Sequence, residues 1–218
     1  MLATLYLSVL LQTVTIVPTV VVKPFPVYMR RDTTQNYIVI HYDDGIEPKS
    51  TLRWLRRKHL AYHYFILRNG IIYKLVDPKY QASHAGWSMW DGHIGMNRYS
   101  IGIALQNDSE QDYTESQYQS LLWLIDVLEK RFPDITVDRI VGHDDVAWPR
   151  GRKQDPGEYF DWLRIKLKRV INVRTVPTLA PYRDTSRDPI PLRLLFPIHD
   201  VVQLSPSMEA PIYRRPQR

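Results

Sequence analysis

The chain has 218 residues, of which 44% are hydrophobic, so one good-sized domain with appendages is expected. Its formal charge of +6 and pI near 9.4 would attract polyanions, but the basic residues are spread out and indicate no specific nucleic-acid site. Cysteine is absent, which excludes disulfides, thiol chemistry and cysteine-based metal sites.

Residues 2–22 carry no charge and are long enough for one membrane span, and Lys23 follows them. Pro18, Gln12 and the lack of a basic residue before the run weaken both the signal-peptide and the transmembrane interpretation. The alternative is that the Val/Thr-rich half, residues 13–22, is an extended strand packed on a partner or on the domain itself. Residues 1–35 are therefore assigned as an N-terminal anchor, signal or assembly arm with a linker.

Residues 36–171 have the pattern of an α/β domain. Residues 37–42 are apolar on both faces, as in a buried central strand, and residues 50–60 follow as a helix with Leu52, Trp54 and Leu55 facing inward. Two β-prone runs, residues 62–67 and 71–76, flank Arg68-Asn69-Gly70 and predict an antiparallel hairpin.

Residues 77–99 show no sustained period but are rich in aromatic residues, which favours a binding loop that forms one wall of a groove. Strand texture returns at residues 100–106. A capping box at Thr114–Gln117 begins a helix that ends at Phe132-Pro133. A short strand at 138–141 and a helix at 159–170 complete the domain, and the Pro-rich residues 172–218 are expected to form an extended arm.

The segment from Gly142 to Gly157 collects a histidine, carboxylates and basic residues in a run punctuated by Gly and Pro, which is typical of a catalytic loop and not of a regular helix or strand. His41 at a strand end, His143 and Asp155 would give zinc three ligands and leave one position open. Lys153 could then stabilise a developing oxyanion, and Tyr62 could hydrogen-bond the attacking water or the tetrahedral intermediate.

Each residue also has a structural interpretation. A histidine at a strand end is often a satisfied structural residue, Asp155 before Pro156 could initiate a turn, Lys153 could belong to a solvated basic patch, and Tyr62 could belong to the core.

The ordered motifs resemble the zinc N-acetylmuramoyl-L-alanine amidase family, which includes AmpD-type amidases, phage lysozyme-type amidases and peptidoglycan recognition proteins. The resemblance spans about residues 36–170 and rests on six segments, residues 37–42, 62–70, 83–86, 97–103, 142–147 and 151–157. It implies a central mixed β-sheet flanked by helices, with zinc held by His41, His143 and Asp155 at the floor of a surface groove. It also implies catalysis by Tyr62 and Lys153, and substrate contacts from His84, Trp87 and Asn97.

One position departs from the AmpD pattern. AmpD-like members carry a catalytic glutamate where this sequence has Ala104, whereas the phage-lysozyme and recognition-protein branches use a tyrosine at the position of Tyr62. Three hypotheses follow: a peptidoglycan amidase of the tyrosine–lysine type, such as a phage or bacterial lysin; an inactive peptidoglycan-binding module; and a component of a virion or lysis assembly. Residues 1–30 and 172–218 would make the membrane or virion contacts, placing the domain at the cell envelope or on a virion.

Overall fold

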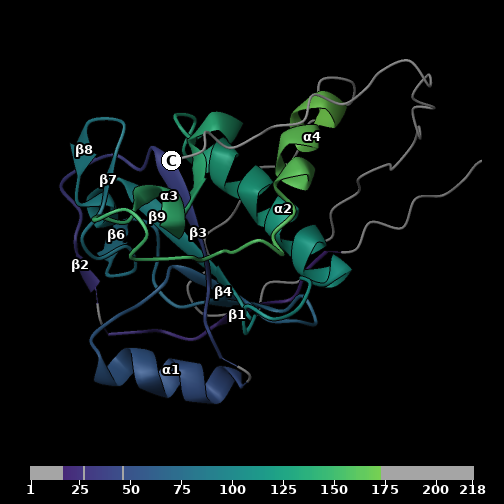
Figure 1. Ribbon diagram of the computed structural model, residues 1–218, viewed down its shortest axis with the longest axis horizontal. Coiled ribbons are helices and arrows are strands. Elements are labelled where there is room, and N and C mark those ends of the chain that lie inside the picture. The colour runs from purple at the N-terminus through teal and green to yellow at the C-terminus, as the bar shows by residue number, and fades with distance from the viewer. Residues whose placement is uncertain (1–16, 27, 46, 173–218) are drawn as a thin grey trace, which may run out of the picture. The chain divides into compact units, whose positions relative to one another are not determined.

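A six-stranded sheet forms the centre of the part of the chain that the computed structural model describes, residues 17–26, 28–45 and 47–172 (Figure 1). The strand order is β1 (Val20–Val22), β5 (Ile72–Lys74), β4 (Tyr64–Ile66), β9 (Ser100–Leu105), β3 (Tyr37–Tyr42) and β10 (Ile140–Gly142). Neighbouring strands run parallel except β4 and β5, which form the predicted antiparallel pair. The sheet is therefore mixed, as expected.

The register of β3 and β9 decides which side chains share a face. His41 pairs with Ala104 and Val39 with Gly102, so these four positions lie on one face, while the isoleucines between them lie on the other. Every residue of β9 is buried, as are the first five of β3. Burial on both faces explains why these strands read as nearly continuous apolar runs.

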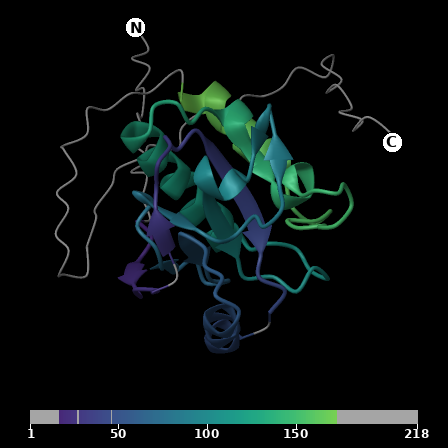
Figure 2. The ribbon, with the colours of Figure 1, turned by 90° about the vertical axis from the view of Figure 1, so that its left-hand side faces the viewer.

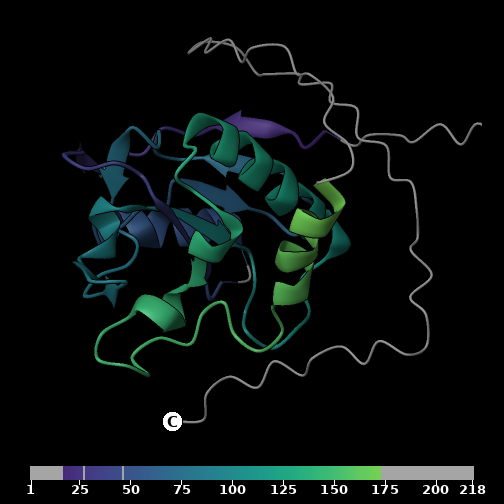
Figure 3. The ribbon, with the colours of Figure 1, turned by 90° about the horizontal axis from the view of Figure 1, so that it is seen from above.

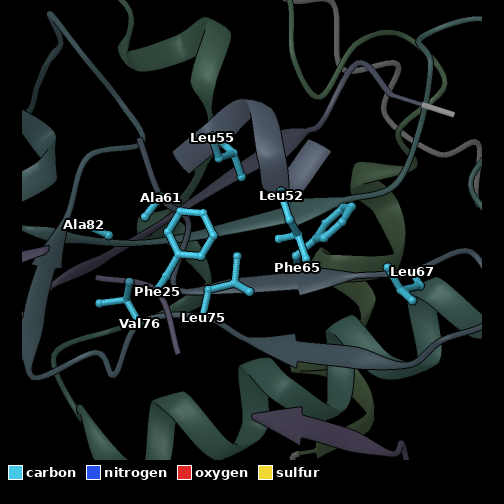
Figure 4. Packing of buried hydrophobic residues seen from close by; sticks show 10 residues of the cluster. Phe25, Leu52, Leu55, Ala61, Phe65, Leu67, Leu75, Val76 and Ala82 are labelled. Atoms are coloured by element: carbon cyan, nitrogen blue, oxygen red, sulfur yellow. The ribbon is translucent and has the colours of Figure 1, made fainter. Parts of the chain in front are cut away.

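Helix α1 (Pro48–Arg57) covers the face that carries His41 (Figure 1). Its Leu52 and Leu55 join a buried apolar cluster with Phe25, Phe65 and other residues drawn in Figure 4. Trp54 was expected to face inward, but its side chain is 45% exposed. At about 100° per residue, Trp54 lies roughly 200° around the helix from Leu52, which turns it away from the core.

Helices α2 (Glu115–Arg131) and α4 (Trp162–Asn172) lie next to each other on the opposite side of the sheet from α1 (Figures 2 and 3). The predicted capping box is present: Thr114 Oγ1 accepts from Gln117 N, and Gln117 Oε1 accepts from Thr114 N. Helix α4 begins three residues later than expected, and the strand expected at 138–141 begins with the 3₁₀ turn η2 (Val137–Arg139).

The region expected to be a binding loop, residues 77–99, contains short regular elements. β6 (Tyr80–Ala82) pairs antiparallel with β2 (Tyr28–Arg30), β7 (Met89–Trp90) pairs with β8 (His93–Ile94), and η1 (Met96–Arg98) follows. Arg31 fastens this region to the sheet, since its guanidinium donates to the Tyr80 and Ser100 carbonyls at 2.9 and 3.1 Å. Arg31 is partly buried, and these carbonyl acceptors satisfy its guanidinium.

The N-terminal segment contributes to the domain from Pro18 onward, since Pro18 is buried and the Thr19 carbonyl accepts from Ile72 N at 2.9 Å. β1 pairs with β5, and Phe25 is 2% exposed within the core cluster, so the alternative of a strand packed on the domain applies to Val20–Val22. The rest of the predicted anchor, residues 2–16, and nearly all of the predicted C-terminal arm lie outside the described residues. Among those described, we find no helix with the length and apolar character required for a membrane span.

Candidate functional site

Three predicted metal ligands meet at one edge of the sheet. His41 is near the end of β3, and His143 opens the short helix α3 (His143–Val146) immediately after the parallel neighbour β10. Because parallel strands end at the same edge, the two histidines converge there. Asp155 returns to them, with its Oδ2 atom 2.9 Å from Nδ1 of both His41 and His143. His143 belongs to the short helix α3, although an irregular loop was expected for residues 142–157.

The three side chains are removed from water, with exposed fractions of 1% for His41, 4% for His143 and 5% for Asp155. Burial lowers the pKa of His41 to about 4, with the nearby His143 acting in the same direction. Burial alone would raise the pKa of Asp155, but the contacts with His143 and His41 outweigh it and hold that pKa below its ordinary value. Near neutral pH the site thus offers an uncharged His41 imidazole and a carboxylate.

The far nitrogen of His143 determines which of its nitrogens can serve as a metal ligand. Nε2 of His143 lies 3.1 Å from the carbonyl oxygen of Ala85, which only accepts hydrogen bonds, so Nε2 carries a proton. In a neutral imidazole, Nδ1 would then direct its lone pair at the Asp155 carboxylate. A cation bound between Nδ1 and the carboxylate would be coordinated by both. The ligand atoms of the three residues all lie within 4.8 Å of one another.

His41 is oriented by a chain of polar contacts behind it. Its Nε2 lies 3.0 Å from Nδ1 of His84, and Nε2 of His84 lies 3.5 Å from Ser100 Oγ, which donates to the Met96 carbonyl. The Met96 carbonyl accepts from Ser100 Oγ, which accepts from Nε2 of His84, and Nδ1 of His84 accepts from Nε2 of His41. Nδ1 of His41 is therefore unprotonated and faces the site.

His84 was predicted to contact substrate, and it does line the pocket described below, although only 8% of it is exposed. Its ring lies directly over Gly102, where an added Cβ would come within 2.4 Å of the ring carbon Cγ. Glycine at this position of β9 thus makes room for His84 beside His41.

The predicted catalytic pair opens onto a pocket of about 680 Å³ beside the ligands. Tyr62 lines it, with its ring centroid 5.2 Å from that of His41, and burial raises the pKa of the Tyr62 phenol. Lys153 lines it from the loop that carries Asp155, and its charge contributes to lowering the pKa of His41. The structure therefore brings both predicted residues to the three ligands.

The two other predicted substrate contacts lie beside the pocket and are not part of its lining. Asn97 uses its side-chain oxygen to accept from the backbone nitrogens of His84 and Ala85, at 2.9 and 2.7 Å. Trp87 is 77% exposed and follows the segment that Asn97 holds.

Sequence reasoning missed several residues that line the pocket. Trp54 and Arg57 come from α1, Arg152 comes from the loop, and Asp43 follows β3. Burial raises the pKa of Asp43 to about 6, opposed by hydrogen bonds from Thr51 and from the Asn107 backbone. The position of Asp43, directly beyond the strand that carries His41, is a signal that could have identified it.

Ala104 lies beside His41 in the sheet and is fully buried in the same apolar cluster as Phe65 and Leu55. Its methyl group fills space on the face that carries the metal ligands, but it supplies no group that transfers protons. Proton handling at this site therefore falls to other residues.

Comparison with known proteins agrees with this geometry. Residues 31–158 match the family described as N-acetylmuramoyl-L-alanine amidase. The 1,6-anhydro-N-acetylmuramyl-L-alanine amidase AmpD of Haemophilus influenzae is 48% identical over 130 residues, which are 59% of this chain and 70% of that protein. A crystal structure of AmpD superposes with a TM-score of 0.60 at 28% identity, covering 73% of this chain and 99% of that one.

The Escherichia coli amidase AmiD, solved with anhydro-N-acetylmuramic acid-L-Ala-D-γ-Glu-L-Lys, superposes with a TM-score of 0.57 at 30% identity. The match covers 63% of this chain and 59% of AmiD. The family match covers more than half of the chain and includes all three candidate ligands, Tyr62 and Lys153. The chain belongs to the N-acetylmuramoyl-L-alanine amidase family.

Proposed function

We propose that this chain is a zinc-dependent hydrolase that cleaves the amide bond between N-acetylmuramic acid and L-alanine in peptidoglycan or its muramyl-peptide fragments. The observation that carries the proposal is the convergence of His41, His143 and Asp155 beside an open pocket lined by Tyr62 and Lys153. The family match supplies the reaction class.

Two imidazole nitrogens and one carboxylate oxygen fit zinc, which prefers such ligands and retains an open position when only three are protein groups. When bound, zinc polarises a carbonyl oxygen and lowers the pKa of water. The neutral state of His41 and the charged state of Asp155 mean that these two ligands need not lose a proton near pH 7.

Tyr62 and Lys153 would act on the oxygen that becomes negative as the amide carbonyl is attacked. Burial raises the pKa of Tyr62, so its phenol remains protonated near neutral pH and acts as a hydrogen-bond donor. This favours stabilisation of the tetrahedral intermediate over removal of a proton from water. The Lys153 ammonium adds a positive charge at the same pocket.

A peptidoglycan-binding module without turnover, suggested by Ala104, is the second candidate. An intact ligand triad disfavours it, because three protein ligands beside an open position are the arrangement of a catalytic zinc site. A role as a phage or bacterial lysin, and the envelope or virion contacts proposed for residues 1–30 and 172–218, depend on segments that lie mostly outside the described residues.

The test is incubation of the zinc-loaded protein with purified cell walls and with a soluble muramyl tripeptide. Mass spectrometry should find peptides with a newly exposed N-terminal L-alanine, and the His143→Ala variant should release none. Wall binding by both proteins with no new N-terminal alanine from either would favour the binding module.

A further inference from the structure

Two exposed tryptophans lie side by side next to the metal pocket. Ser88 and Ala147 form an antiparallel bridge, and Trp148 N donates to the Trp87 carbonyl at 3.0 Å, so Trp87 and Trp148 are directly opposed. Ser88 and Ala147 are buried, at 2% and 0% exposure, and successive side chains in extended backbone point to opposite sides. The two indoles therefore share the solvent side, where they are 77% and 47% exposed.

Arg152 holds the backbone beneath both rings. Its Nη2 donates to the Trp87 carbonyl at 2.6 Å, and its Nε donates to the Trp148 carbonyl at 2.9 Å. Residues directly opposed across antiparallel backbone have Cβ atoms about 5 Å apart, which places the two side chains next to each other. The two residues thus form an apolar surface on backbone held by Arg152, and we call them the tryptophan pair.

Arg152 connects the tryptophan pair to the metal pocket. Arg152 lines that pocket, and it also donates to the Ala85 carbonyl at 3.3 Å. The same carbonyl accepts from Nε2 of His143, so one backbone oxygen connects the residue beneath the tryptophans to a metal ligand. A molecule bound to the tryptophan pair would therefore lie near the rim of the pocket.

We propose that the tryptophan pair stacks against pyranose rings of the glycan strand that bears the reacting muramyl residue. The inference rests on the proposed function and deepens it by adding an extended glycan to the substrate. The target amide joins a sugar to a peptide, so the pocket needs one side for each. Indole offers a flat apolar face with a polar edge, and a pyranose offers an apolar C–H face bordered by hydroxyl groups.

Charge assigns the peptide to the pocket and not to the two indoles. A stem such as the L-Ala-D-γ-Glu-L-Lys bound by AmiD carries free carboxylates, which complement Arg57 on α1 and Lys153 on the loop. Trp87 and Trp148 offer no charge to such a peptide. A neutral carbohydrate is therefore the occupant that suits the pair.

The test uses a peptide-free probe, N-acetylglucosamine hexamer, titrated against the full chain by isothermal calorimetry. We expect Trp87→Ala and Trp148→Ala each to weaken binding by about tenfold, which corresponds to about 1.4 kcal/mol for a lost aromatic contact. Trp87→Tyr should retain most of the affinity because it keeps a flat ring. Ile94→Ala is the matched control, since Ile94 is another exposed apolar residue, 68% exposed, on the neighbouring hairpin.

Several outcomes would overturn the proposal: no binding of the hexamer by the wild type, equal binding by the Trp87→Ala and Trp148→Ala variants, or an equal loss in Ile94→Ala. Tryptophan-dependent dimers in sedimentation velocity, without any effect on hexamer binding, would assign the pair to a second copy of the chain. If Trp148→Ala proves unfolded by circular dichroism, hexamer binding by Trp148→Phe and by the Trp87 variants tests the proposal instead. The hexamer contains no amide between a muramyl residue and L-alanine. A wild type that binds the hexamer but shows no amidase activity would therefore contradict the proposed function and not the role of the tryptophan pair.

Discussion

Replacing Tyr62 with phenylalanine isolates one hydroxyl at the candidate site. Within the described residues, no hydrogen bond from the Tyr62 hydroxyl to another protein group is found, while its ring packs against the buried cluster that contains Phe65. Phenylalanine keeps that packing, so the free energy of unfolding should change by less than about 0.5 kcal/mol. Zinc content should also be unchanged, because Tyr62 is not among the three ligands.

The cost should appear in turnover. Removing one preorganised donor from a developing oxyanion lowers kcat by about 10²–10³, or about 2.7–4 kcal/mol of transition-state stabilisation. The assay is release of N-terminal L-alanine from a soluble muramyl tripeptide at saturating substrate, with kcat and KM measured separately. Tyr73→Phe is the matched control, because Tyr73 packs against the same cluster from β5 but does not line the pocket. A decrease in kcat of less than about threefold in Tyr62→Phe would refute the assigned role.

Three further outcomes follow from the geometry. His84→Ala should weaken zinc binding by about 10–100-fold in competition with a chelating dye, because the partner of His41 Nε2 is lost; unchanged affinity would contradict that contact. Gly102→Ala should lower the free energy of unfolding by about 1–3 kcal/mol in urea titrations, since its methyl group would collide with the His84 ring, and no loss would show that the ring moves aside freely. Burial, aided by Arg31, lowers the pKa of His63 to about 3, so below pH 6.5 the unfolded chain binds a proton that the folded chain does not. This difference at His63 should lower the free energy of unfolding of the metal-free protein by up to about 1.4 kcal/mol per pH unit as the pH drops from 6.5 toward 3. His63→Gln should lose less stability than the wild type between pH 6 and 4. Equal slopes of unfolding free energy against pH for the two proteins would exclude the effect.

Local pattern was sufficient for the central strands and for α2, because burial on both faces and a capping box leave direct traces in the sequence. It was not sufficient for β1, because the valines of Val20–Val22 continue the uncharged run that also suits a membrane span. What makes them a strand is pairing with Ile72–Lys74, a partner distant in sequence. Trp54 was misplaced for a different reason: an amphipathic helix tolerates a large aromatic residue on its exposed side when that side borders a pocket.

The ligands of the candidate site could be predicted because strand ends, spacing and resemblance agreed on His41, His143 and Asp155. The arrangement of the residues around the ligands could not be predicted from the sequence. The contact between Trp87 and Trp148 depends on a bridge between residues 88 and 147, which no local pattern encodes. The burial of His84 depends on the missing side chain of Gly102, and the sequence indicates only that something approaches β9 closely there.

The most direct measurement of the central claim combines metal analysis with product identification on one preparation of the protein. We expect one zinc ion per chain and release of peptides that begin with L-alanine. For Asp155→Ala we expect zinc well below one per chain and no such peptides, because Asp155 faces both histidines. Hydrolysis by a zinc-free preparation, or a fully zinc-loaded wild type that releases no such peptide, would refute the proposed function.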